Sequence, residues 1–120
     1  MKLISNKKKT LFDGDQEELF SAGFKMPCLN CSGVLTFKPG DFKSCSTLDN
    51  TVSDFVIPKI KRVKSINLGD DVFYKVDGLP LKYDLLTCES CKAKYFGFFG
   101  VGEYQPTRFM LILVALILTD

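Results

Sequence analysis

The stretch TCESCKAKYFGFFG, residues 87–100, decides how this sequence is interpreted, because it joins a C-x-x-C pair to a run of aromatic residues. A second C-x-x-C pair stands upstream in MPCLNCSGVLTF, residues 26–37. Cysteines at positions i and i+3 lie on one side of a tight turn, where both sulfur atoms can bind the same metal ion. The two pairs therefore have to be interpreted together, as a metal site, as disulfides or as reactive thiols.

A metal site with four sulfur ligands is the interpretation that we favour. Its predicted ligands are Cys28, Cys31, Cys88 and Cys91. The chain contains no histidine, so the mixed sites of cysteine and histidine are excluded and an all-sulfur site remains. We expect zinc, with iron as the second choice. Four protein ligands leave no open position for water or substrate, so the ion is expected to be structural.

Disulfides and redox chemistry are the disfavoured alternatives. The start of the chain, MKLISNKKKT, lacks the order of a secretory signal, so we expect a cytoplasmic protein, in which disulfides are rare. A thioredoxin-type pair needs a strand that opens into a long helix, and neither pair has that context. The fifth cysteine, Cys45, is expected to be buried or idle, because a free cysteine behaves as a small apolar side chain.

The segments CLNCSG and CESCKAKY resemble the zinc knuckles of zinc-ribbon and rubredoxin-like proteins. The resemblance covers these two segments alone and implies a zinc-ribbon-like β domain over residues 1–120. Such knuckles usually carry glycine directly after the second cysteine, where this chain has Ser32 and Lys92. The segment between the knuckles, residues 32–87, is far longer than in a compact ribbon. We expect this long insert to fold as its own sheet and to return the second knuckle to the first.

A mainly β fold, a small α+β type with an antiparallel meander and one short N-terminal helix, is predicted around this site. The helix is expected in DGDQEELFSAG, residues 13–23, with Asp13 or Asp15 as its cap and Gly23 at its end. KPGDFKSCSTLDN is expected to be a loop. Strands are predicted in VLTF, VSDFVIP, KIKRVKSINL, DVFYKV and LKYDLLTC, followed by a hairpin of KAKYFGFFG and RFMLILVALIL around VGEYQPT.

The apolar run near the C-terminus, residues 109–118, is predicted to be a buried strand. A helix that crosses a membrane needs about 20 such residues, and this run is shorter. Because the run is uniformly apolar instead of alternating, both of its faces should be covered. Burial within the domain is the ordinary explanation, and self-association through this strand is the alternative.

The function that we expect from the sequence is non-enzymatic binding of one protein partner, by analogy as a dedicated inhibitor or immunity-like protein. The formal charge of +2 falls to zero once four thiolates and one zinc ion are counted, so the holo-protein lacks the basic surface typical of nucleic-acid binders. An enzyme is disfavoured because the chain has no histidine and no phosphate-binding loop. Glu103 and Arg108 are instead expected to form an ion pair in the hairpin loop.

Nucleic-acid binding is the alternative function. Its support is two basic stretches, NKKK at residues 6–9 and KIKRVK at residues 59–64. The candidate contacts to phosphate are Lys61, Arg62 and Lys64. Aromatic residues near the second knuckle, residues 95–99, offer base stacking, although packing in a hairpin core is the better explanation for them.

Overall fold

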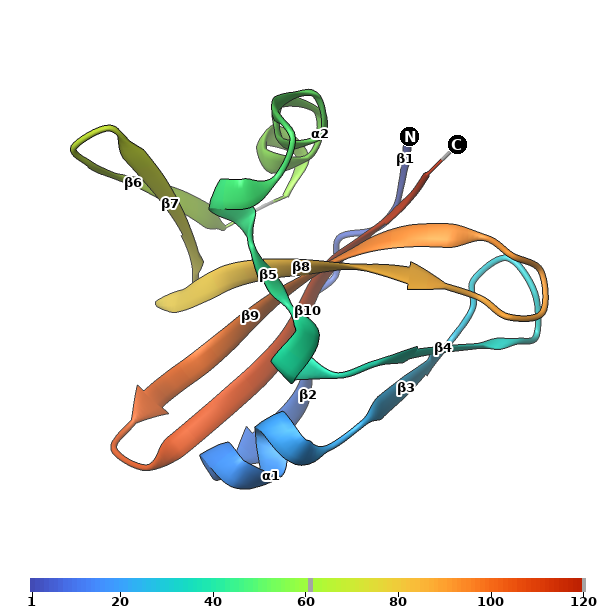
Figure 1. Ribbon diagram of the computed structural model, residues 1–120, viewed down its shortest axis with the longest axis horizontal. Helices are drawn as coiled ribbons and strands as arrows, with labels where there is room; N and C mark the ends of the chain where they lie inside the picture. The colour runs from blue at the N-terminus through green and yellow to red at the C-terminus, as the bar shows by residue number, and fades with distance from the viewer. Residues whose placement is uncertain (61, 120) are drawn as a thin grey trace.

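The structure, a computed structural model, describes residues 1–60 and 62–119 and is mainly antiparallel β (Figure 1). The two α-helices are α1 (Gln16–Ser21) and α2 (Asn50–Val56), and three short 3-10 helices are η1 (Pro39–Asp41), η2 (Cys45–Thr47) and η3 (Ile57–Lys59). The strands are β1 (Lys2–Ser5), β2 (Lys9–Gly14), β3 (Phe24–Pro27), β4 (Val34–Phe37), β5 (Lys43–Ser44), β6 (Val63–Leu68), β7 (Asp71–Val76), β8 (Leu79–Thr87), β9 (Lys94–Gln105) and β10 (Arg108–Leu118).

Eight of the strands form one sheet, in the order β1-β10-β9-β8-β7-β6, with β2 also on β10 and β5 on β8. The run from β6 to β10 is an antiparallel meander, as predicted. β3 and β4 form a separate two-stranded sheet. The expectation that the insert of residues 32–87 forms its own sheet is wrong, because β8 pairs with β9 along seven residue positions and so joins the insert to the main sheet.

β10 is an inner strand of the main sheet, and both of its faces are buried, which confirms the prediction from its uniform hydrophobicity. Leu111 and Leu113 point into one core with Leu19 of α1, whereas Ile112 and Val114 point into a second core with Val56 of α2. In Figure 1 these helices lie at the bottom and the top of the view. β9 covers one edge of β10, and β1 and β2 share the other. The strand is therefore enclosed within this chain.

The N-terminal residues form two short strands that were not predicted from the sequence. β1 pairs with β10 through Lys2↔Leu118 and β2 pairs with it through Phe109↔Gly14. These short segments depend on β10 for their strand hydrogen bonds, so their local sequence gave little signal. β3 was missed for the same reason, since it depends on pairing with β4.

VSDFVIP is helix α2 with η3, not a strand, so the chain has two short α-helices among its described residues where one was predicted. Asp49 caps α2 by accepting a hydrogen bond from the Thr51 backbone N–H at 2.8 Å. Val52, Phe55 and Val56 pack into the core on the α2 side at separations of three and four residues, which is a helical spacing. β-branched residues favour strands in general, but here the cap and the packing of one face decide for helix.

α1 begins where the sequence predicted, with the Glu18 N–H donating to Asp15 Oδ1 at 2.9 Å. It ends at Ser21 with Ala22 as its C-cap, before Gly23. None of the helices in the described ranges has the length and hydrophobicity to span a membrane.

The β9–β10 hairpin turns at residues 106–107, so most of VGEYQPT belongs to β9. The predicted pair of Glu103 with Arg108 is wrong. The Arg108 guanidinium lies 2.9 Å from Asp13 Oδ1, and the Tyr104 hydroxyl donates to the same oxygen. β2 lies beside β10 and places the Asp13 carboxylate next to the Arg108 guanidinium.

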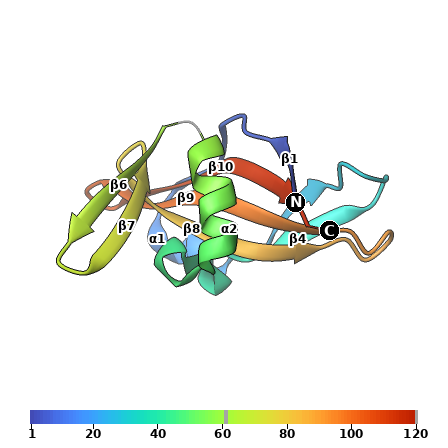
Figure 2. The same ribbon diagram turned by 90° about the horizontal axis from the view of Figure 1, so that it is seen from above.

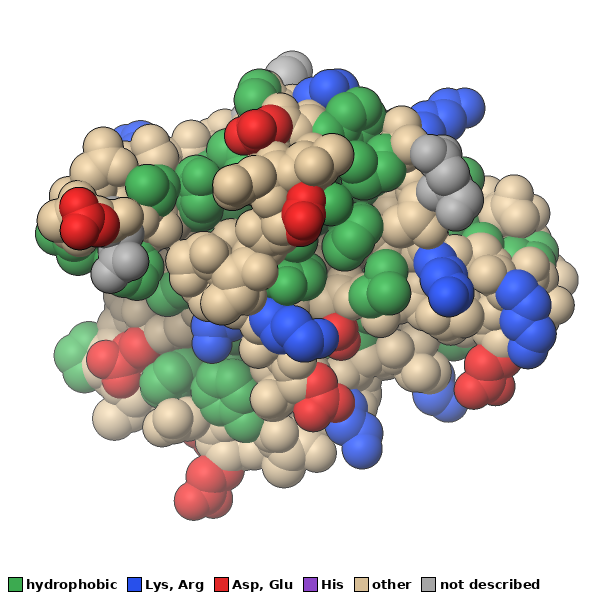
Figure 3. All heavy atoms as spheres, turned by 45° about the horizontal axis from the view of Figure 1, so that its top comes forward, with side chains coloured by type: hydrophobic (Ala, Val, Ile, Leu, Met, Phe, Trp, Pro, Cys, Tyr) green, Lys and Arg blue, Asp and Glu red, His purple; other side chains and the backbone are tan. Residues whose placement is uncertain are grey.

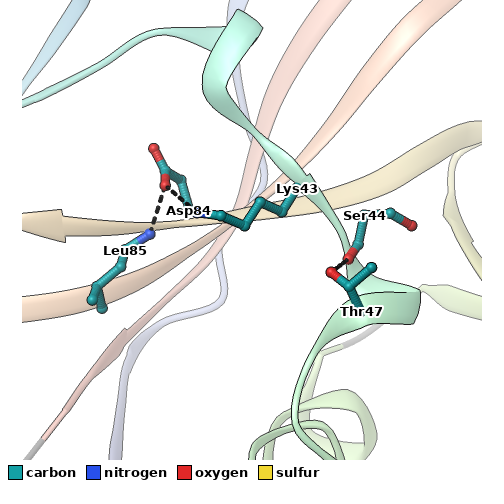
Figure 4. A network of polar contacts seen from close by, with 5 residues as sticks. All are labelled: Lys43, Ser44, Thr47, Asp84 and Leu85. Atoms are coloured by element: carbon teal, nitrogen blue, oxygen red, sulfur yellow. Dashed lines mark hydrogen bonds and ion pairs between the residues drawn. The ribbon is translucent and has the colours of Figure 1, made fainter.

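The segment expected to be a loop, residues 38–50, contains η1, β5 and η2 and crosses the sheet over β8. β5 pairs with β8 through Lys43↔Tyr83 and Ser44↔Lys82. Lys43 Nζ lies 3.8 Å from Asp84 Oδ1, which also accepts from the Leu85 N–H at 2.9 Å (Figure 4). Partial burial raises the pKa of Asp84 above its ordinary value, and Lys43 opposes that rise. This crossing leads the chain from the β3–β4 hairpin to α2.

Candidate metal centre

Each C-x-x-C pair lies at the tip of a β-hairpin. The β3–β4 ladder ends with the pair Pro27↔Val34, and Cys28 follows directly; the β8–β9 ladder ends with Thr87↔Lys94, and Cys88 follows directly. In both turns the first cysteine donates its backbone N–H to the carbonyl five residues later, Gly33 and Ala93, at 2.9 Å. The two turns thus share this closing hydrogen bond. Their tips lie side by side at the right of Figure 1.

The two tips bring four sulfur atoms together, all within 4.8 Å of one another. The close contacts cross between the pairs, with Cys28 Sγ 3.7 Å from Cys91 Sγ and Cys31 Sγ 3.6 Å from Cys88 Sγ. All four are free thiols, so neither pair is a disulfide. Cys28 and Cys88 are buried, and Cys31 and Cys91 are half-buried. The convergence of the four predicted cysteines forms a cluster that can hold a metal ion.

Three polar groups surround this cluster and point toward sulfur. The Gly33 N–H donates to Cys31 Sγ at 3.2 Å, the Asn30 side-chain amide to Cys91 Sγ at 3.5 Å, and the Tyr95 hydroxyl lies 3.4 Å from Cys28 Sγ. Hydrogen bonds to thiolate ligands are the usual outer support of a metal site. Sequence reasoning assigned Tyr95 to a hairpin core and missed this role. Its position seven residues after Cys88 shows no recognisable motif.

The same contacts set the acidity of the metal-free thiols. The Tyr95 hydroxyl lowers the pKa of Cys28 to about 6, and the Asn30 amide lowers the pKa of Cys91 below its ordinary value. The Gly33 N–H favours the thiolate of Cys31, but the sulfur of Cys91 and the other neighbours outweigh it and raise the pKa of Cys31 to about 12. Thiolates packed this closely repel one another, so ionisation of the whole cluster calls for a cation at its centre.

The departures from the usual knuckle pattern have different structural consequences. Lys92, directly after the second cysteine of its turn, has φ of 64°, the left-handed conformation that favours glycine. In the other turn Gly33 is the residue that cannot be replaced, because a Cβ there would lie 2.7 Å from Cys88 Sγ and 2.9 Å from Ser90 Oγ. In the first turn, Gly33 thus allows close contact with the opposite hairpin tip. In the second turn, Lys92 has a strained backbone conformation.

Cys45 lies outside the four-sulfur cluster. It is buried in η2, within the core on the α2 side of the sheet. The prediction that Cys45 is buried is confirmed. Burial raises the pKa of this thiol to about 12, so it stays protonated at neutral pH.

The residues considered for nucleic-acid binding are divided by the structure. Arg62 and Lys64 are exposed, and Lys61 lies outside the described residues. Tyr95, Phe98 and Phe99 are buried, so their assignment to base stacking is wrong and their assignment to the core is confirmed. The Phe99 ring stacks on Phe42 with centroids 4.3 Å apart. No matching protein family, curated protein or solved structure was found for this chain.

Proposed function

We propose that Cys28, Cys31, Cys88 and Cys91 bind one structural zinc ion. A tetrahedral zinc ion with bonds of about 2.3 Å to sulfur separates its ligands by about 3.8 Å. The distances of 3.6 Å between Cys31 and Cys88 and 3.7 Å between Cys28 and Cys91 fit that value. An all-sulfur ligand set also suits iron, which remains our second choice.

The bound ion would join two parts of the fold that are otherwise held by packing. β3–β4 forms its own small sheet, and its inward residues Leu35 and Phe37 lie in the core on the α1 side. Bonds from one ion to residues far apart in sequence would tie this sheet to the β8–β9 hairpin, so that binding energy becomes folding energy. Because protein sulfur atoms fill the tetrahedron, the proposed role is structural and not catalytic.

The test of the metal proposal is elemental analysis of the purified chain together with a substitution. We expect one zinc ion per chain, and we expect Cys88→Ser to lose the metal and unfold at lower temperature, because ligand binding and folding are coupled. Cys45→Ala is the matched control and should keep the metal, since Cys45 lies in the other core. A metal-free preparation that is fully folded and as stable as the zinc-loaded chain would refute the proposal.

We further propose that this metal-braced domain is a non-enzymatic, cytoplasmic protein that binds one protein partner, of the inhibitor or immunity type. Two observations support it: the formal charge is zero once zinc and four thiolates are counted, and the hairpin of β6 and β7 exposes large apolar side chains. The hairpin extends from the end of the sheet (Figure 2), and hydrophobic side chains are visible over it at the left of Figure 3. Affinity capture from the native host should recover one stoichiometric protein. Failure under several lysate conditions would count against this proposal.

Nucleic-acid binding remains the second candidate, because the fold brings the two basic stretches together. The Asn6 side-chain amide donates to the Lys59 carbonyl at 3.5 Å, and Lys7, Lys8 and Arg62 line one hollow. If this surface binds nucleic acid, affinity should fall steeply with salt, and charge reversal at Arg62 and Lys64 should abolish binding. Absence of binding to single- and double-stranded DNA and RNA at low salt would remove this candidate.

A further inference from the structure

β6 is an edge strand: it pairs with β7 on one side, and it ends the order of the main sheet among the described residues. Five of its six residues are exposed. An edge strand has a row of backbone N–H and C=O groups that are free to pair with another chain. The backbone of β6 can therefore accept a further strand.

One face of the β6–β7 hairpin combines apolar and basic side chains. Ile66 lies opposite Phe73 in the antiparallel register, and Leu68 follows on the same face. Their exposed fractions are 38% for Ile66, 39% for Phe73 and 62% for Leu68. With Pro80 and Leu81 of β8 they line a hollow of about 430 Å³. Water-exposed apolar side chains grouped in this way favour a binding surface.

Among the described residues, the charged side chains that line this hollow are Lys75 and Lys82. Lys64 lies directly opposite Lys75 on the same face, an arrangement that is unfavourable for two like charges, and Lys82 lines the same hollow as Lys75. A second hollow shares Ile66 and Lys75 with this one. Among the described residues that line the two hollows, the one acid is Asp77, which forms an ion pair with Lys8. A negative partner would relieve the repulsion between the two opposed lysines.

We propose that the edge of β6 binds an extended, acidic segment of the protein partner, which adds as a strand. Its side chains on the hollow side are apolar opposite Ile66 and Leu68 and carry a carboxylate opposite Lys64. This inference rests on the proposed protein-binding function and specifies its partner. The backbone edge supplies affinity, and the hollow and the lysines supply specificity.

Two other occupants fit the same surface less well. A second copy of this chain, paired edge to edge, would bring one basic groove against another. A single-stranded nucleic acid would find one exposed aromatic ring, Phe73, beside the half-buried Tyr74 and aliphatic side chains that do not stack on bases. An acidic peptide uses the edge, the aliphatic side chains and the lysines together.

The experiment measures binding of the zinc-loaded protein to the synthetic peptide Glu-Thr-Ile-Thr-Ile-Thr-Glu by fluorescence anisotropy. We expect saturable binding, and we expect Lys64→Glu with Lys75→Glu to weaken it by at least about tenfold and to favour a peptide with lysine in place of glutamate. Lys25→Glu with Lys38→Glu makes the same change in net charge on exposed residues elsewhere and should bind as the unaltered protein does. Methylation of alternate backbone nitrogen atoms of the peptide should abolish binding, because it blocks strand pairing.

The inference is overturned if the acidic peptide does not bind, if both charge variants weaken it equally, or if the methylated peptide binds as well. Tighter binding of an oligothymidylate at this surface, or a dimer that Lys64→Glu with Lys75→Glu dissolves, would overturn it in favour of the other occupants. Capture of the native partner separates this inference from the proposed function. A partner that the Lys64 and Lys75 variant retains would refute the β6 site and leave protein binding intact.

Discussion

Lys92 occupies a backbone position in the second cysteine turn that suits glycine, with φ of 64°. A residue with a Cβ pays a steric penalty in this left-handed region that glycine avoids. We expect Lys92→Gly to raise the free energy of unfolding by about 0.5–1 kcal/mol, measured by urea denaturation of the zinc-loaded protein.

Ser32→Gly is the control, because Ser32 occupies the equivalent place in the first turn without a positive φ. It should give no gain, since glycine there only adds freedom to the unfolded chain. Equal effects of the two substitutions would show that the strain at Lys92 is not what limits stability.

Tyr95 is the residue that we expect to tune the affinity for metal. Its buried hydroxyl lies 3.4 Å from Cys28 Sγ, and the ring is 1% exposed. Tyr95→Phe keeps the ring and removes the hydrogen bond, so it should weaken zinc binding by about tenfold or more, measured by competition with a chromophoric chelator. Tyr83 packs against the core on the α2 side, so the control substitution Tyr83→Phe should leave zinc affinity unchanged. Loss of thermal stability without loss of zinc affinity would assign Tyr95 to packing alone.

Among single residues, the sequence identified the four cysteines but not the polar side chains that contact their sulfur atoms. Spacing and the absence of histidine were sufficient to select Cys28, Cys31, Cys88 and Cys91, because the i, i+3 turn is a local structure. Tyr95 and Asn30 contact sulfur atoms more than 60 positions away in the chain. No local pattern encodes such contacts.

Between elements, the Asp13 carboxylate connects β2 to the β9–β10 hairpin, because it contacts both Tyr104 and Arg108. The hydroxyl of Tyr104, and after it Arg108, lowers the pKa of Asp13 below its ordinary value of 3.8. A carboxyl whose pKa is lowered by folding adds stability above its unfolded pKa, and that stability is lost as the pH falls through the folded pKa. Tyr104→Phe should therefore move the pKa of Asp13 upward toward 3.8, measured by NMR titration of the side-chain carbons.

The control for this titration is the acid unfolding midpoint in an Asp13→Asn background. There Tyr104→Phe should leave the midpoint unchanged, because its partner carboxylate is gone. An unaltered pKa of Asp13 in the single Tyr104→Phe variant would contradict the contact.

The elements that sequence reasoning placed correctly are those with strong local patterns. α1 has a capping aspartate and acids in its first turn, and the long strands β8, β9 and β10 are rich in apolar and aromatic residues. β1, β2 and β3 are short and depend on partner strands for their hydrogen bonds. α2 has β-branched residues that favour a strand, and packing of Val56 against the sheet overrides that preference.

For the whole molecule, removal of the metal should loosen one side more than the other. The four cysteines belong to the α1 side or pack against its core, whereas the core on the α2 side contains none of them. With a chelator, amide hydrogen exchange in β3 and β4 should rise by at least about tenfold while the centre of β10 stays protected. Uniform loss of protection across all strands, or no change, would contradict this division.

The sequence by itself determined the parts of this protein that short-range chemistry controls: the two cysteine turns, the mainly β character, the meander of residues 63–118 and the burial of its last strand. Hydrophobic periodicity and ligand spacing act over a few residues, so they can be recognised without coordinates. Only the tertiary structure decided that the hairpin tips meet, that the Tyr95 hydroxyl lies beside Cys28 Sγ, and that β6 forms an edge of the sheet with Lys64 opposite Lys75. These features depend on contacts between residues distant in the chain, where packing of the complete fold selects among the local alternatives.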